Sequence, residues 1–107
     1  MRRGEVWRFQ RERPVREEDV RTPYRVVVTA TYRITDDQPW VLTASVESAD
    51  PASLVAVRLG ERDPVLGWVR ADRLTSTYRS WLDGPVGALS PETTDLLDSA
   101  IRNELDL

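Results

Sequence analysis

The sequence predicts a mainly β, α+β fold in which one C-terminal helix packs on a small antiparallel sheet or barrel. Three observations predict it. The chain has 107 residues, enough for one core but not for two. The centre of residues 24–32 is β-branched almost throughout, which suits a strand, and apolar residues recur at helical spacing after Pro91. We therefore expect a single domain over residues 1–107.

The first predicted strand covers residues 5–9, where polar and apolar residues alternate and Val6 faces the core. Residues 10–20 mix arginines, acids and Pro14 without a clear period. Such a composition is typical of a long loop between two strands.

Residues 24–32 are expected to form the central strand. Val26 and Val28 point to one side and Val27 to the other, so both faces meet apolar surface. Arginines at the start of this strand then stand at a rim, where a rigid backbone can aim them at a ligand.

The middle of the chain is expected to form shorter strands separated by turns and loops. Strands are expected at residues 40–46 and 54–59, with a turn at 35–39 and a loop at 60–67. Residues 67–75 are ambiguous between short strands and a helical turn.

The C-terminus carries the clearest helix signal. Ser90 is a strong N-cap, Pro91 suits the first helical position, and Glu92 favours the positive end of the helix dipole. The predicted packed face comprises Leu96, Leu97, Ala100, Ile101 and Leu105, with Asp95, Asp98 and Glu104 facing outward.

Charge is unevenly distributed along the chain. Residues 1–33 hold nine arginines against five acids, whereas residues 34–107 hold six against thirteen. A basic first third on an acidic body is compatible with a local phosphate-binding patch, while the net charge of −3 argues against non-specific affinity for nucleic acid.

Missing residue types exclude several chemistries. The chain has no cysteine and no histidine, which excludes disulfides, thiolate catalysis, a histidine general base and the usual zinc sites. We expect no metal and no other cofactor. No apolar run could cross a bilayer and no secretory pattern is present, so we expect a cytoplasmic protein without a membrane partner.

Residues 1–7, the strand 25–30, and above all residues 72–82 followed by 86–92 resemble the MazF/PemK family of toxin-antitoxin systems. The resemblance implies a small SH3-like, half-open barrel with a C-terminal α-helix, the CcdB/MazF-like fold. It further implies a homodimer that acts as a metal-independent endoribonuclease, a hydrolase of RNA.

The resemblance also implies a catalytic site. Typical members place an Arg-Pro pair at the start of the central strand and a threonine at the end of the next strand. If the central strand is aligned with that of the family, Arg25 takes the position of the catalytic arginine. If Pro23 is aligned with the family's proline instead, Arg21 is the nearest substitute for that arginine. We prefer Arg25 because the valine run keeps the strand in register. Ser45 stands where the family has threonine, with Thr43 as a second candidate.

Cleavage without metal can use the neighbouring 2′-hydroxyl of RNA as nucleophile, so the protein need only align the backbone and stabilise charge on the phosphate. A guanidinium does this with bidentate donors. Trp40 and Trp68 are assigned to the core. The residues expected to bind RNA are Arg8, Arg11, Arg13, Arg16, Trp7 and Trp81.

Two functions follow as hypotheses. The first is a MazF-like endoribonuclease toxin that cleaves single-stranded RNA such as mRNA, forms a homodimer, and is blocked by an antitoxin whose acidic, disordered tail lies across the basic first loop. The alternative is a non-catalytic protein of the same fold that acts by binding a protein, as a gyrase poison or a silent regulator.

Overall fold

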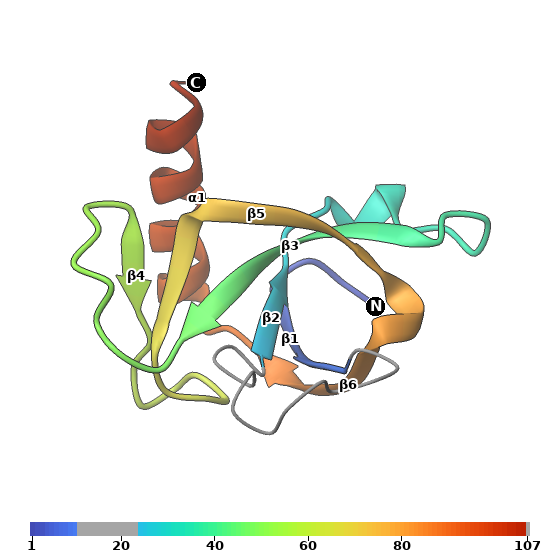
Figure 1. The fold of residues 1–107 in the computed structure, drawn as a ribbon, viewed down its shortest axis with the longest axis horizontal. Helices are drawn as coiled ribbons and strands as arrows, with labels where there is room; N and C mark the ends of the chain where they lie inside the picture. The colour runs from blue at the N-terminus through green and yellow to red at the C-terminus, as the bar shows by residue number, and fades with distance from the viewer. Residues whose placement is uncertain (11–23, 107) are drawn as a thin grey trace.

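A computed structural model describes residues 1–10 and 24–106 of the chain. In this part of the chain, six strands form one sheet and a single α-helix follows them (Figure 1). The strands are β1 (Glu5–Phe9), β2 (Tyr24–Val27), β3 (Trp40–Glu47), β4 (Ala56–Arg58), β5 (Trp68–Tyr78) and β6 (Leu82–Ala88), the helix is α1 (Pro91–Leu105), and the 3-10 turns are η2 (Thr31–Arg33) and η3 (Arg79–Trp81).

The six strands pair in the order β4-β5-β3-β2-β1-β6, and every pairing is antiparallel. The sheet is strongly bent but not closed, because β4 and β6 remain its two edges. In Figure 1, β5 runs along β4 and then turns to follow β3 across the molecule. The predicted mainly β, half-open barrel with a C-terminal helix is confirmed.

The main core lies between one face of this sheet and α1. It is dominated by β-branched and small side chains, which pack closely on a pleated surface. The buried members of the core are Val6, Val26, Ala44, Val46, Val57, Leu59, Val69, Ala71, Leu89, Leu97 and Ala100.

Helix α1 begins as predicted. Ser90 is the N-cap, and its Oγ accepts a hydrogen bond from the Thr93 backbone N–H at 3.3 Å. Asp63, in the loop before β5, accepts from the Ser90 backbone N–H and from the Thr93 hydroxyl, at 2.8 and 2.7 Å. One loop carboxylate therefore fixes the start of the helix to the sheet.

The predicted packed face of α1 is wrong at two positions. Leu97 and Ala100 are buried, but Leu96 is 59% exposed and Leu105 is 53% exposed. The helix packs mainly on β4 and β5, so a narrow stripe of it is covered. Asp98, predicted to face outward, is partly buried and accepts a hydrogen bond from Arg3 at 2.7 Å.

The central strand is shorter than predicted, because β2 ends at Val27 and a 3-10 turn occupies Thr31–Arg33. The Val28 N–H still donates to the Leu42 carbonyl at 2.9 Å. The next bond is different, since the Leu42 N–H donates to the Thr29 hydroxyl at 2.7 Å. A side chain replaces the backbone acceptor there and ends the ladder.

Other predicted boundaries also change. Residues 54–59 contain only the three-residue strand β4, and the ambiguous residues 67–75 belong to the single long strand β5. Strand β6 was not predicted, because Gly84, Pro85 and Gly87 are poor strand formers. Proline is tolerated here because β6 lies at the edge of the sheet.

The prediction that Trp40 belongs to the core is wrong, because this residue is 40% exposed at the start of β3. Trp68 is half-buried. In the described part of the chain, no helix has both the length and the apolar character needed to span a bilayer.

Candidate active site

Arg25 and Ser45 lie directly opposite each other on the neighbouring strands β2 and β3. Arg25 is half-buried and Ser45 is only 3% exposed. The Arg25 Nε and the Ser45 Oγ are buried, and neither has a hydrogen-bond partner among the described residues. Leaving a buried polar atom unpaired costs about 1–3 kcal/mol, and such atoms are rare in native proteins. This pair is therefore where a polar ligand could restore hydrogen bonds.

Strand alternation explains why Arg25 reaches this position. Val26 enters the main core, so its neighbours Arg25 and Val27 point to the opposite face of β2. The Arg25 guanidinium lies over the Phe9 ring, with Cζ 4.7 Å from the ring centroid, which is a cation–π geometry. Because Phe9 ends β1, three adjacent strands build the site.

The site holds a partly desolvated positive charge. Burial lowers the pKa of the Arg25 guanidinium, because the charged form loses hydration, and the nearby Glu47 carboxylate opposes this shift. Arginine remains protonated despite such shifts. Glu47 Oε1 also lies 3.7 Å from Nη1 of Arg73. Neither residue is among the predicted site residues, although strand alternation from Ser45 points to Glu47.

Thr43, the alternative hydroxyl, is fully buried opposite Val27. Its Oγ1 lies 3.0 Å from the Thr77 hydroxyl and donates to the Thr75 carbonyl at 3.4 Å. Because these bonds remain within the sheet, the geometry favours Ser45 as the hydroxyl available to a ligand.

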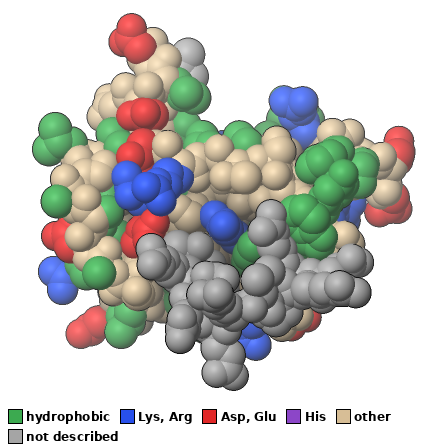
Figure 2. Space-filling view, viewed as in Figure 1, with side chains coloured by type: hydrophobic (Ala, Val, Ile, Leu, Met, Phe, Trp, Pro, Cys, Tyr) green, Lys and Arg blue, Asp and Glu red, His purple; other side chains and the backbone are tan. Residues whose placement is uncertain are grey.

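Four aromatic side chains form a continuous row that ends at Arg25. Trp40 stacks on Tyr78 with ring centroids 3.8 Å apart. Tyr78 then meets Trp81 edge to face at 4.8 Å, and Trp81 meets Phe9 in the same way at 6.2 Å. Figure 2 shows hydrophobic side chains gathered at this end of the molecule, where β3 begins and β5 ends. Phe9, Trp81, Tyr78 and Trp40 are called the aromatic row below.

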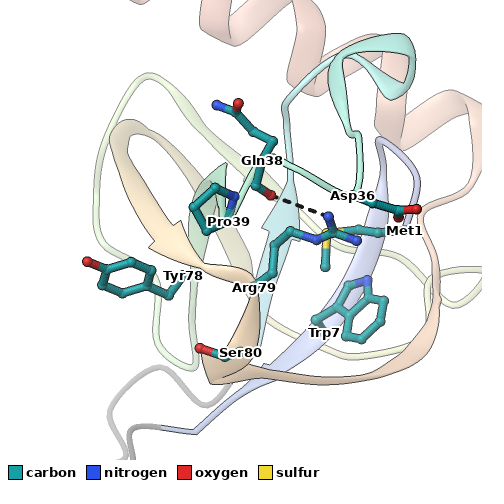
Figure 3. A pocket seen from close by; sticks show the side chains of 8 residues that line it. All are labelled: Met1, Trp7, Asp36, Gln38, Pro39, Tyr78, Arg79 and Ser80. Atoms are coloured by element: carbon teal, nitrogen blue, oxygen red, sulfur yellow. Dashed lines mark hydrogen bonds between the residues drawn. The ribbon is translucent and has the colours of Figure 1, made fainter.

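Trp7, a predicted RNA-binding residue, is the cross-strand partner of Arg25 but lines a separate open pocket of about 510 Å³ (Figure 3). Arg79 is fixed there, because its Nη1 donates to the carbonyls of Thr35 and Gln38 at 2.8 and 3.3 Å. In Figure 3 the Tyr78 ring points away from Arg79 and Trp7. The pocket is lined by Met1, Trp7, Asp36, Gln38, Pro39, Tyr78, Arg79 and Ser80.

Of the other predicted site residues, the structure describes Trp81 and Arg8. Trp81 is half-buried within the aromatic row. Arg8 is exposed on β1, between its cross-strand neighbours Tyr24 and Asp83. Within residues 1–10 and 24–106, no group of three acidic, histidine or cysteine side chains is arranged to hold a metal ion. Outside the described residues lie Arg11, Arg13, Arg16 and Arg21.

A half-open antiparallel sheet of this strand order, followed by one C-terminal helix, is a MazF-like toxin fold. No protein-family model matches the sequence, and no curated protein matches it either. The assignment therefore rests on solved structures.

Three of these structures are representative. An endoribonuclease from a Mycobacterial species, in complex with its cognate antitoxin, matches with a TM-score of 0.83 at 20% identity, over 100% of this chain and 96% of that chain. A MazE-MazF crystal structure from Deinococcus radiodurans matches with a TM-score of 0.76 at 15% identity, over 99% and 96%. The Mycobacterium tuberculosis toxin MazF-mt6 matches at 0.75 and 15%, over 96% and 97%. The predicted MazF-like fold is confirmed, and at these identities the likeness concerns the fold alone.

Proposed function

We propose that this chain is the toxin of a toxin-antitoxin system and cleaves single-stranded RNA as a metal-independent endoribonuclease, with residues 1–107 acting as one domain. The observation that carries the proposal is the pair Arg25 and Ser45, whose buried polar atoms have no partner among the described residues. The endoribonucleases and MazE-MazF complexes among its structural relatives support the same reading.

Arg25 is the proposed catalytic residue. A phosphate placed between β2 and β3 accepts hydrogen bonds from the Arg25 guanidinium and from the Ser45 hydroxyl. The guanidinium stabilises negative charge that develops on the phosphate oxygens, and its partial burial strengthens that interaction. The neighbouring 2′-hydroxyl of RNA acts as the nucleophile, which restricts the reaction to RNA.

The aromatic row supports a single-stranded substrate. Unpaired bases stack on aromatic side chains, whereas bases within a duplex are already stacked on each other. Trp40 is partly exposed, and the row reaches Arg25 through Phe9. A strand whose phosphate sits at Arg25 can therefore extend its bases along this row.

The decisive experiment incubates the purified protein with a long RNA in EDTA and maps the new ends by primer extension. We expect discrete cuts with the wild-type protein and at least a 100-fold slower reaction with Arg25→Ala. Arg25→Lys should recover only part of the rate, because lysine keeps the charge but lacks the bidentate fork. Arg58→Ala, an exposed arginine on β4, is the matched control.

Each outcome of that experiment has a clear meaning. Equal cutting by Arg25→Ala and loss of cutting by Arg21→Ala would move the catalytic role to Arg21. A wild-type protein that cuts no RNA would favour the alternative function, a non-catalytic protein that acts by binding another protein.

We also propose a homodimer and an antitoxin partner. Leu96 and Leu105 leave apolar surface on α1, and two-fold pairing is the commonest way to cover such surface. Light scattering should give twice the chain mass of 12.2 kDa. Co-expression with the neighbouring open reading frame should yield a complex, and harmless expression of this chain alone without co-purification would argue for a silent regulator.

A further inference from the structure

A cluster of charged side chains lies beside Arg25, at the end of β3 and the bend of β5. Glu47 is two residues beyond Ser45, so strand alternation places both on the face of the sheet that carries Arg25. Arg73 lies 3.7 Å from Glu47, and Arg70 pairs with Asp72 at 2.7 Å. Figure 2 shows basic and acidic side chains adjoining on this face, over the bend of β5.

Cleavage by a 2′-hydroxyl needs a proton acceptor as well as a positive charge. The chain contains no histidine, lysine or cysteine, and arginine does not lose its proton in proteins. Tyrosine is protonated at neutral pH. A carboxylate is therefore the side chain able to accept the proton, and the cluster offers two of them.

Asp72 is the less available of the two. Arg70 donates to both of its carboxylate oxygens, from Nε to Oδ1 at 3.0 Å and from Nη2 to Oδ2 at 2.7 Å. This bidentate pairing lowers the pKa of Asp72 and occupies its oxygens. Accepting a proton would remove the negative charge that strengthens both bonds.

The Glu47 carboxylate is more available to accept a proton. Its ionic contact with Arg73, 3.7 Å from Oε1 to Nη1, is longer than a hydrogen bond. It is near enough to Arg25 to affect that guanidinium electrostatically, and a residue diagonal to Arg25 across an antiparallel ladder lies within reach of long side chains. Of the two carboxylates in the cluster, Glu47 is therefore the one that no bidentate partner engages when Arg25 and Ser45 hold a phosphate.

We propose that Glu47 accepts the proton of the attacking 2′-hydroxyl, an inference that rests on the proposed ribonuclease function. The O–H bond breaks, its proton passes to the Glu47 carboxylate, and the 2′-oxygen forms a bond to phosphorus. The bond from phosphorus to the 5′-oxygen breaks, and that oxygen takes a proton from water. Glu47 then returns its proton to solvent. The products are a 2′,3′-cyclic phosphate and a 5′-hydroxyl end.

The first test separates chemistry from binding. Glu47→Gln keeps the size of the side chain but removes the proton acceptor, so the single-turnover rate on a short labelled RNA should fall about 100-fold or more. The dissociation constant for that RNA should stay the same or decrease, because one negative charge leaves the phosphate site. Weaker binding with an unchanged rate would overturn the proposal and leave Glu47 as a positioning residue.

The second test is chemical rescue. Glu47→Ala removes the carboxylate and leaves space, so added formate should restore the rate in proportion to its concentration. Arg25→Ala should gain nothing from formate, since it lacks a charge rather than a base. A rate loss in Glu47→Gln without formate rescue of Glu47→Ala would also overturn the proposal. Thermal melting of each variant confirms that it is folded.

Two further variants complete the design. Glu92→Gln is the matched control. Glu92 is also paired with an arginine, Arg62 at 3.3 Å, but it lies exposed at the start of α1. The cleavage rate of this variant should equal that of the wild-type protein. Loss of rate in Asp72→Asn but not in Glu47→Gln would assign the base to Asp72. Failure of the wild-type protein to cut RNA removes the proposed function itself, whereas an active Glu47→Gln removes only this role.

Discussion

Trp40 and Tyr78 are direct cross-strand partners on β3 and β5, and their rings stack with an interplanar angle of 25°. Aromatic cross-strand pairs stabilise antiparallel sheets. This pair also holds the exposed Trp40 ring in a fixed orientation at the outer end of the aromatic row. A partly exposed ring that its neighbour already orients is suited to stacking a base, because little freedom is lost on binding.

Trp40→Ala should therefore weaken binding of single-stranded RNA by about 1–3 kcal/mol, which is the usual value of one base stacked on an aromatic side chain. Fluorescence anisotropy with an uncleavable 2′-deoxy-substituted oligonucleotide measures the affinity without turnover. Tyr32→Ala is the control, since Tyr32 is 84% exposed and lies outside the row. Equal affinity of the two variants would show that the row does not bind bases.

Ser45→Ala should reduce cleavage without reducing the stability of the free protein. The Ser45 Oγ is buried and has no hydrogen-bond partner among the described residues, so its removal relieves a desolvation cost of about 1–3 kcal/mol. Chemical denaturation measures the free energy of unfolding, and single-turnover kinetics measure the cleavage rate. Ser45→Thr keeps the hydroxyl and should retain activity. If Ser45→Ala is instead destabilised but fully active, Ser45 is an ordinary structural residue.

The loop arginines give a third prediction. Arg11, Arg13 and Arg16 lie outside the described residues, and the sequence predicts that they contact the RNA backbone. Replacing all three with glutamine should weaken RNA binding and reduce the dependence of affinity on salt, because fewer counterions are released. Binding isotherms at several salt concentrations measure that slope. An unchanged slope would place the loop away from the RNA.

The fourth prediction concerns pH and Asp63. Burial raises the pKa of this carboxyl, but hydrogen bonds from the backbones of Ser90 and Gly60 and from the Thr93 hydroxyl outweigh that effect, so its pKa lies below the ordinary 3.8. A lowered pKa in the folded state means that the ionised carboxylate stabilises the fold above pH 3.8. This contribution is lost as the pH falls through the folded-state pKa.

Asp63→Asn should therefore be less stable than the wild-type protein at neutral pH and should lose less stability on acidification below pH 3.8. Thermal melting between neutral pH and pH 2 measures both effects. Asp50→Asn is the control, because the Asp50 carboxylate accepts a local hydrogen bond from the Ala52 backbone N–H at 2.8 Å and lies outside the contacts that anchor the helix. Parallel curves for wild type and Asp63→Asn would contradict the proposed origin of the pKa shift.

The parts of the fold that depend on local sequence could be predicted. The alternation around Val6 and Val26 defines two strands, and Ser90 followed by Pro91 defines the start of the helix. Strand β6 could not be predicted, because its Asp-Gly-Pro-Val-Gly sequence resembles a turn and becomes a strand by pairing with β1. Long-range pairing overrode local propensity there.

The same distinction holds for the site. The position opposite Arg25 depends on the register between β2 and β3, and resemblance to a known family, rather than local pattern, pointed to Ser45. The aromatic row joins side chains from β1, β3, β5 and η3. No spacing along the sequence predicts such a row, because its members meet only when the sheet bends.

The pairing of β1 with β6 has a consequence for how the protein is made. Val6, near the beginning of the chain, pairs with Gly87, and the Gly4 carbonyl accepts a hydrogen bond from the Leu89 N–H at 2.9 Å. A ribosome synthesises β1 well before its edge partner β6, with β2 to β5 in between. The first of these strands must therefore wait on the nascent chain, with one side of its backbone unpaired, until all the others have emerged. The sheet thus cannot be completed strand by strand as the chain is synthesised.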